Sequence, residues 1–268
     1  MASLFTEDFI RVVERLRIRT SQVPAGGRHA EHRSRNLGAG MEFRDFRSYV
    51  PGDDTRRVDW NLYRRSGRLF LRLFEEPEDL AIYVLVDVSD SMFFESPPRA
   101  DAARQMAGVF ASIGLSQFDR VGIYPCGSDL GTPLQPVSGR QNLRRGLEFL
   151  DRLQPAGPTD LSRCVARFSA LRQRPGLAVI VSDFFDPHGV EHVIDAMRSL
   201  RHRLVLVQLV KRGDGDPSVD GEYRMIDCES SAVVDVAVTQ RVRERYHQAY
   251  AAFNEALRKK PPVPSMPR

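Results

Sequence analysis

The sequence predicts an α/β protein with a mostly parallel central sheet, and three observations support this class. Two short runs, Ala81–Val86 and Leu177–Ser182, are almost continuously apolar and rich in β-branched residues. Such runs are typical of strands that are buried on both faces. Helical patterns separate these and further strand-like runs, and strands that alternate with helices imply right-handed βαβ units. A Rossmann-like sheet is therefore expected, preceded by an irregular or β-hairpin segment.

Residues 1–79 are expected to form that N-terminal segment. Apolar residues at helical spacing after Thr6 predict a short first helix. From 23 to 72, glycine and proline interrupt short, arginine-rich runs, which favours loops and hairpins. Within it, Pro51–Trp60 has strong turn chemistry. Its aspartates are expected either to pair with nearby arginines in a charged lattice around the tryptophan, or to belong to a partner-docking element, and the two interpretations are compatible.

The main domain is expected to span residues 80–260. Its expected strands are Ala81–Val86, Arg120–Cys126, Leu177–Ser182, Arg203–Leu209, Tyr223–Ile226 and Val233–Val238. Its expected helices are Arg99–Leu115, Gln141–Leu153, Leu161–Arg172, Val190–Leu200 and Gln240–Lys259. The last helix carries apolar residues three or four apart and should dock on the body. The proline-rich residues 261–268 are expected to be a disordered tail.

The composition is that of a soluble globular protein. Of 268 residues, 42% are hydrophobic and 28% are charged. The apolar runs are far shorter than the ~20 residues of a membrane span, and residues 1–20 lack the apolar core of a signal peptide. These features predict a cytoplasmic protein without a membrane span. The three cysteines have no metal-ligand spacing, so reduced, mostly buried thiols are expected.

The net charge of +4 is modest for this length, so nucleic-acid binding is not expected. The arginine-rich residues 28–72 leave RNA or phosphate binding open as a minor alternative. That alternative predicts a steep dependence of binding on salt.

Polar side chains gather where the predicted strands end. The first buried strand runs into Asp87-Val88-Ser89-Asp90-Ser91, and the strand at Leu177–Ser182 is followed directly by Asp183. Thr159 lies in a loop before a predicted helix. In parallel sheets the functional loops lie at the carboxyl ends of the strands. The candidate metal ligands are Asp87, Ser89, Ser91, Thr159 and Asp183.

Oxygen ligands without histidine or cysteine suit Mg²⁺, with Mn²⁺ or Ca²⁺ as alternatives. A simpler interpretation is that Asp or Ser after a strand caps the next helix. Position by position, however, these five residues resemble the metal-ion-dependent adhesion site of von Willebrand factor A domains, and the likeness covers about Leu80 to Val210. The resemblance implies that hydroxyls contact the metal, that aspartates often act through water, and that a partner's acidic residue completes the coordination.

A second resemblance covers residues 20–210. The motifs that carry it are Gly38-x-Gly40-Met41-Glu42-Phe43-Arg44, Arg47-x-Tyr49-x-Pro51-Gly52-Asp53-Asp54-x-Arg56-x-Val58-Asp59-Trp60, Arg64 and Phe74-Glu75-Glu76. They resemble the signature of the bacterial domain-of-unknown-function family fifty-eight. This resemblance implies an accessory protein that helps a MoxR-type AAA+ ATPase act on client proteins or complexes. Many relatives also carry membrane helices and an extra β-domain, so a short soluble form is expected here.

Large apolar residues directly follow the candidate ligands. They are Met92, Phe93, Phe94, Phe184 and Phe185. Beside a solvent-facing metal, such residues either pack beneath the ion or form an apolar collar that contacts a partner. The hypothesis is that at least two of them are exposed and bind the partner.

The rival function is a Mg²⁺-dependent phosphoryl-transfer enzyme of the haloacid-dehalogenase-like type, with Asp87 as nucleophile or metal ligand. Such enzymes use a second aspartate as acid and base at the position of Ser89, whose hydroxyl does not titrate near neutral pH. The chain also has neither a nucleotide-binding P-loop nor the Gly-x-Ser-x-Gly elbow of hydrolases. The sequence therefore favours a non-catalytic, metal-dependent interaction module.

Overall fold

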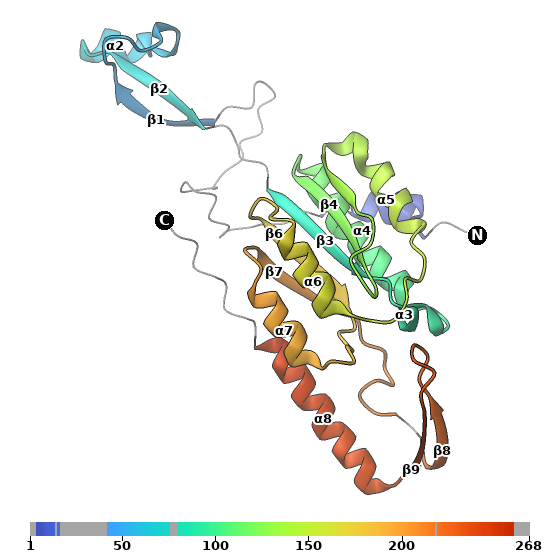
Figure 1. Ribbon diagram of the computed structural model, residues 1–268. Coiled ribbons are helices and arrows are strands. Elements are labelled where there is room, and N and C mark those ends of the chain that lie inside the picture. The colour runs from blue at the N-terminus through green and yellow to red at the C-terminus, as the bar shows by residue number, and fades with distance from the viewer. Residues whose placement is uncertain (1–3, 14, 17–41, 76–79, 218, 260–268) are drawn as a thin grey trace. The chain divides into compact units, whose positions relative to one another are not determined.

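The structure is a computed structural model, and it describes residues 4–13, 15–16, 42–75, 80–217 and 219–259 (Figure 1). The chain divides into two compact units, one of which spans Pro24–Asp79 while the other holds the remaining residues. The tail at 261–268, expected to be disordered, lies outside the described residues.

The larger unit is built on a five-stranded sheet in the order β5-β4-β3-β6-β7. The strands are β3 (Ala81–Asp87), β4 (Arg120–Cys126), β5 (Leu134–Ser138), β6 (Leu177–Ser182) and β7 (Arg203–Gln208). All neighbours pair in parallel except β5, which runs antiparallel to β4 at one edge. Numbered within the sheet, the order is 3-2-1-4-5, as in doubly wound folds. The expected Rossmann-like class with a mostly parallel sheet is confirmed.

Helices cover both faces of this sheet (Figure 1). Side chains alternate along a strand, so Val84 of β3 joins one hydrophobic cluster and Leu85 joins the other. The first cluster includes residues of α4 (Arg99–Ser116) and α5 (Leu143–Asp151). The second includes residues of α6 (Leu161–Ala170), α7 (Val190–Arg198) and α8 (Gln240–Arg258). Burial on both faces explains why β3 and β6 are apolar at almost every position, and α8 docks as expected.

The N-terminal helix α1 (Glu7–Val13) packs with the larger unit. Phe5, just before it, belongs to the first hydrophobic cluster, and the backbone N–H of Leu4 donates to a carboxylate oxygen of Asp151 at 3.3 Å. The boundary between residues 79 and 80 agrees with the expected one, but the first helix, expected in the N-terminal segment, groups with the larger unit. The helix belongs with the sheet, because its apolar face completes the core over α4.

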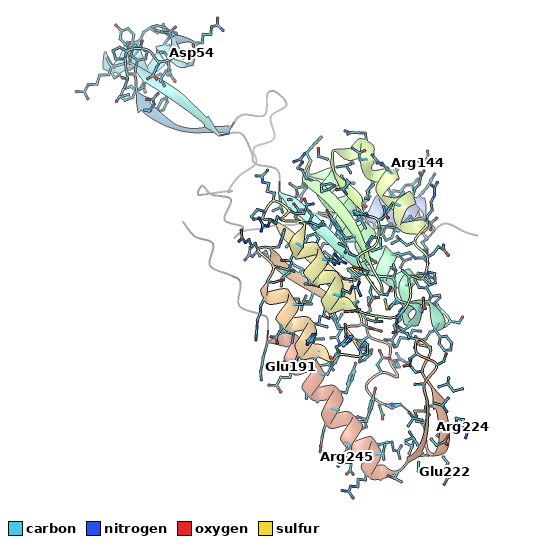
Figure 2. All side chains as sticks on the ribbon, in the orientation of Figure 1. Asp54, Arg144, Glu191, Glu222, Arg224 and Arg245 are labelled. Atoms are coloured by element: carbon cyan, nitrogen blue, oxygen red, sulfur yellow. The ribbon has the colours of Figure 1, made fainter. Side chains whose placement is uncertain are left out.

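The described part of the smaller unit is a hairpin of β1 (Glu42–Ser48) and β2 (Phe70–Glu75), with η1 (Thr55–Arg57) and α2 (Trp60–Ser66) between the strands. The expected N-terminal hairpin is confirmed. Asp54, labelled in Figure 2, and Asp59 cap η1 and α2 by accepting from backbone N–H groups, while the expected charged lattice around Trp60 stays a prediction. Asp53 pairs with Arg47 at 2.8 Å.

Two elements of the larger unit were not expected from the sequence, α3 (Asp90–Phe94) and the edge strand β5; η2 (Arg140–Asn142) precedes α5. After β7, β8 (Gly221–Ile226) and β9 (Val233–Val238) form a separate antiparallel hairpin. Cys126 and Cys164 are buried free thiols, as expected, whereas Cys228 is exposed. Among the described residues, no helix has the length and apolar character needed to cross a membrane.

Candidate metal-binding site at the carboxyl edge of the sheet

Asp87 is the innermost residue of the site. It ends β3, next to the strand β6 that ends at Ser182, and it is 2% exposed. One carboxylate oxygen accepts from the backbone N–H of Ser89 at 2.9 Å and from its hydroxyl at 2.7 Å. The other accepts from the Ser182 hydroxyl at 2.5 Å. Burial raises the pKa of Asp87, and these hydrogen bonds oppose that rise only in part.

Ser89 occupies the N-cap position of α3, but its hydroxyl makes no capping hydrogen bond. The hydroxyl instead contacts Asp87 and lies 3.1 Å from the hydroxyl of Ser91. The capping interpretation of this serine therefore fails. Asp90, between the two serines, accepts from the backbone N–H of Gly157 at 3.1 Å and ties this loop to the one that carries Thr159.

Thr159 reaches the site because two loops approach each other closely. A Cβ on Gly127 would lie 2.3 Å from the carbonyl oxygen of Ala156, so only glycine allows this contact. Asp160, and not Thr159, caps α6 by accepting from the backbone N–H of Arg163. Thr159 is only 5% exposed. Because its side chain is not needed to cap α6, it can serve as a candidate ligand.

Asp183 follows β6 and is 6% exposed. Its carboxylate accepts from the backbone N–H of Phe185 at 3.1 Å and from the Arg99 guanidinium at 2.9 Å. Burial and the charge of Asp87 raise the pKa of Asp183 to about 6, although Arg99 opposes the rise. Phe184, between Asp183 and Phe185 in the sequence, has a left-handed φ of 64°, an uncommon conformation for a bulky residue.

Arg99, the first residue of α4, belongs to the site although no sequence motif indicates it. Its side chain is 9% exposed, and its guanidinium contacts Asp183 at 2.9 Å, Asp214 at 2.5 Å and Glu95 at 3.3 Å. Glu95 also pairs with Lys211. The partners Asp183 and Asp214 are 84 and 115 residues away in sequence, so no local pattern could reveal these contacts.

Glu229 also went unnoticed in the sequence. It lies in the turn between β8 and β9, yet one of its carboxylate oxygens accepts from the backbone N–H of Thr159 at 2.8 Å. The other accepts from the Thr159 hydroxyl at 2.7 Å and, more weakly, from the backbone N–H of Ser91 at 3.4 Å. Burial acts to raise the pKa of Glu229, but the hydrogen bonds from Thr159 and Ser91 outweigh it and lower the pKa.

The structure therefore brings the five predicted residues to one edge of the sheet. The set of donors is made of hydroxyl and carboxylate oxygens, which suits a hard divalent cation such as Mg²⁺ or Mn²⁺. The carboxylates also disfavour one another's charge, since Asp87 raises the pKa of Asp183 and Glu229 raises that of Asp87. A bound cation would relieve this repulsion, so the residues present fit a metal ion.

The apolar residues that follow the candidate ligands differ in exposure, and two of the five are exposed, as the hypothesis required. Met92 and Phe184 are fully buried core residues, so they cannot contact a partner in this conformation. Phe93 packs against the first hydrophobic cluster, with the Arg104 guanidinium 5.6 Å from its ring centroid. Phe94 is 75% exposed.

Phe185 is 42% exposed, although its ring stacks on Phe253 of α8 at 5.0 Å. Phe94 and Phe185 are thus the two exposed members of the expected collar. With Ser91, Asp183 and Glu229 they line a cavity of about 460 Å³ beside the candidate ligands.

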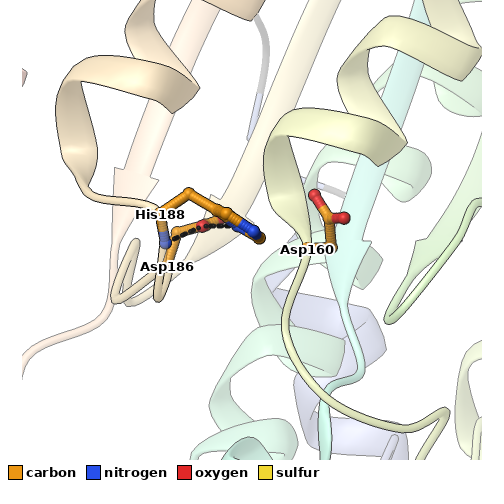
Figure 3. A group of neighbouring side chains, drawn as sticks. All are labelled: Asp160, Asp186 and His188. Carbon is orange, nitrogen blue, oxygen red and sulfur yellow. Dashed lines mark hydrogen bonds and ion pairs between the residues drawn. The ribbon is translucent and has the colours of Figure 1, made fainter.

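A second group of polar side chains, Asp160, Asp186 and His188, lies nearby (Figure 3). One ligand atom from each lies within 4.8 Å of the others. Asp186 accepts from the backbone N–H of Leu161 at 2.9 Å and from the backbone and ring nitrogens of His188 at 2.9 and 3.0 Å. With Asp160 acting as the cap of α6, these contacts explain the group as the link between the start of α6 and the loop after β6.

The fold and the site define an α/β protein with an oxygen-lined site at the carboxyl edge of a doubly wound sheet. The chain belongs to the DUF58 family, described as a protein family of unknown function, whose model matches residues 45–256. An uncharacterised protein of Mycobacterium tuberculosis is 26% identical over 242 residues, which cover 88% of this chain and 76% of the relative. An uncharacterised protein of Mycobacterium bovis matches to the same extent.

Similar solved structures are distant. The hypothetical protein BatB from Bacteroides thetaiotaomicron has a TM-score of 0.41 and 11% identity, and the match covers 67% of this chain and 98% of that one. An aerotolerance-related membrane protein from Bacteroides fragilis has a TM-score of 0.39 and 14% identity, with 67% and 99% covered. The manganese-loaded TRAP protein of Plasmodium vivax has a TM-score of 0.35 and 19% identity, with 50% and 59% covered.

Proposed function

We propose that this chain is a non-catalytic protein-interaction module that binds Mg²⁺ and uses the ion to hold an acidic side chain of a partner. The observation that carries the proposal is the convergence of three hydroxyl groups and two buried aspartates, from three separate loops, at one sheet edge. A bound divalent ion would supply a positive centre able to bind a carboxylate. This is the chemistry that the resemblance to metal-ion-dependent adhesion sites implies.

Each residue has a role in this proposal. The hydroxyls of Ser89, Ser91 and Thr159 would contact the metal directly. Asp87 and Asp183 would balance its charge, and Asp87 is already held in place by hydroxyls from two strand ends. Arg99 orients the Asp183 carboxylate through their ion pair and would do so with or without the ion.

The surroundings of Asp87 favour binding over phosphoryl transfer. A nucleophilic aspartate must meet the substrate, but this residue is 2% exposed and both of its oxygens accept hydrogen bonds. Ser89, at the position of the acid–base aspartate of phosphatases, cannot exchange a proton near neutral pH. We therefore expect no phosphatase activity above background with Mg²⁺, and turnover that Asp87→Asn abolishes would contradict this part of the proposal.

For the partner, we propose an AAA+ ATPase of the MoxR type, which this chain would assist in acting on client proteins or complexes. The support is the resemblance of the signature motifs to a family associated with such ATPases. Phe94 and Phe185, exposed beside the candidate ligands, would contact apolar groups around the partner's acidic residue.

A pull-down from native lysate, with Mg²⁺ or with EDTA, tests the proposal. Wild-type chain should capture an AAA+ ATPase with Mg²⁺ and lose it with EDTA, and Asp183→Asn should capture little in either buffer. Asp195→Asn is the matched control, because Asp195 is an exposed aspartate of α7 that pairs only locally with Arg198. Equal capture by wild type and Asp183→Asn in excess Mg²⁺ would refute the proposal.

A further inference from the structure

The turn that carries Glu229 is held in a defined conformation by its own side chains. Asp227 accepts from the backbone N–H of Glu229 at 3.0 Å, and from the backbone N–H and hydroxyl of Ser230 at 2.6 and 2.7 Å. Its own backbone N–H donates to the carbonyl of Ala232 at 2.8 Å. The backbone at Glu229 is therefore preorganised, and its side chain loses less entropy when it makes a contact.

Glu229 is also what joins this turn to the body of the sheet. Within the described residues, the hydrogen bonds between the turn 227–232 and the rest of the unit all end on its carboxylate. The strands that flank the turn are largely solvent-exposed, with Ile226 66% and Val233 55% exposed. Apolar burial therefore contributes little to docking the turn, and the carboxylate makes the specific contact.

That carboxylate lies among the candidate ligands. It engages the hydroxyl of Thr159, which would contact the metal, and the backbone N–H of Ser91, a second candidate ligand. Its charge also acts on Asp87, in the centre of the site. A carboxylate in this position meets the groups that would surround an acidic residue of a partner.

We propose that Glu229 is an internal ligand of the site, and that it occupies the place a partner's acidic side chain would take. The inference rests on the proposed metal-dependent function. In the isolated chain Glu229 completes the coordination of the bound ion. A partner must displace it, and the β8–β9 hairpin with it, before its own carboxylate can bind.

The test uses the full chain, Mn²⁺ alone as the probe, and the substitution Glu229→Gln. Glutamine keeps the size of the side chain but can accept hydrogen bonds at only one of the two atoms. Glu222→Gln is the matched control, since Glu222 is an exposed residue of the same hairpin and lies at the end of β8 remote from the turn (Figure 2). Water-proton relaxation measures the affinity for Mn²⁺ and the waters on the bound ion, and hydrogen exchange measures protection of the Thr159 amide.

We expect Glu229→Gln to bind Mn²⁺ at least about tenfold more weakly than wild type, as losses of ligand-shell groups do. The bound ion should carry an additional exchangeable water, the Thr159 amide should exchange faster, and Glu222→Gln should match wild type. If wild type binds Mn²⁺ and Glu229→Gln has the same affinity and hydration, the internal ligand is refuted while the metal site stands.

If wild type binds no Mn²⁺, the proposed metal-dependent function fails. Hydrogen exchange of the Thr159 amide then tests the remaining claim, that Glu229 occupies the site without a metal ion. Faster exchange in Glu229→Gln supports Glu229 as the occupant of the site, and unchanged exchange overturns it.

Discussion

Replacing Arg99 by methionine should destabilise the metal-free protein strongly. The side chains of Arg99, Asp183 and Asp214 are 9%, 8% and 12% exposed, and the two pairs measure 2.9 and 2.5 Å. Methionine fills much of the volume of the arginine stem, so the change removes charge more than packing. Removing one member of a buried ion pair costs ~3–5 kcal/mol, because it leaves an uncompensated buried charge. Glu95 adds little, since it is 37% exposed.

The charge of Asp183 sets the pH at which the effect is measured. Its pKa is raised to about 6, first by burial and then by the charge of Asp87. At a pH of about 7.5 the carboxylate is ionised in the wild type, so Arg99→Met removes the counter-charge of an ionised group. If a divalent ion binds beside Asp183, it supplies a new counter-charge, and Mg²⁺ should restore part of the stability of the variant.

Urea unfolding of both proteins, with EDTA or with excess Mg²⁺, measures these effects. Arg144→Met is the matched control, because the Arg144 side chain is 90% exposed and pairs with Glu148 one turn away (Figure 2). We expect that control to unfold like wild type. An Arg99→Met protein that lost no more stability than Arg144→Met would refute the assignment of Arg99 as the buried counter-ion of Asp183.

Three further predictions concern residues around the site and the core. Phe94→Ser should unfold like wild type in urea but capture less partner, because Phe94 is 75% exposed. Met92→Ala should lower the free energy of unfolding by ~2–5 kcal/mol, because Met92 is fully buried. Equal losses of stability in the two variants would contradict this difference in burial. Gly127→Ala should lose ~1–3 kcal/mol in the same assay, because its Cβ would lie 2.3 Å from the Ala156 carbonyl. Burial lowers the pKa of His202 from 6.5, so the unfolded chain takes up the proton first. The unfolding free energy should therefore fall as pH drops below about 6.5, and less so in His202→Leu; identical pH profiles would exclude this role.

The strands of the sheet were predictable where burial on both faces requires a continuous run of apolar residues in the sequence. β3 and β6 are apolar at almost every position because helices cover both faces of the sheet. The edge strand β5 left no such pattern, since it is short, only partly buried and contains Pro136. Helix α3 was not predicted, because it spans only five residues and begins within the Asp-x-Ser-x-Ser loop.

The site was predictable only as far as each part follows the end of its own strand or precedes a helix. Glu229 contacts Thr159 across 70 residues, so no local motif reveals it. The sequence also does not predict which residues of α3 are exposed. Met92 and Phe94 are two positions apart, yet one is fully buried and the other 75% exposed, because the phase of a five-residue helix cannot be read from its sequence.

The turn that carries Glu229 is covalently part of the chain whose site it enters. A tethered ligand competes at an effective concentration of about millimolar or more, whatever the dilution of the protein. If Glu229 is the internal ligand, a partner that offers a lone carboxylate would rarely win this competition. A partner that also binds a second surface, such as the exposed Phe94, gains avidity and displaces Glu229. The hairpin would then set a threshold that rejects stray acidic groups and admits a partner able to make two contacts together.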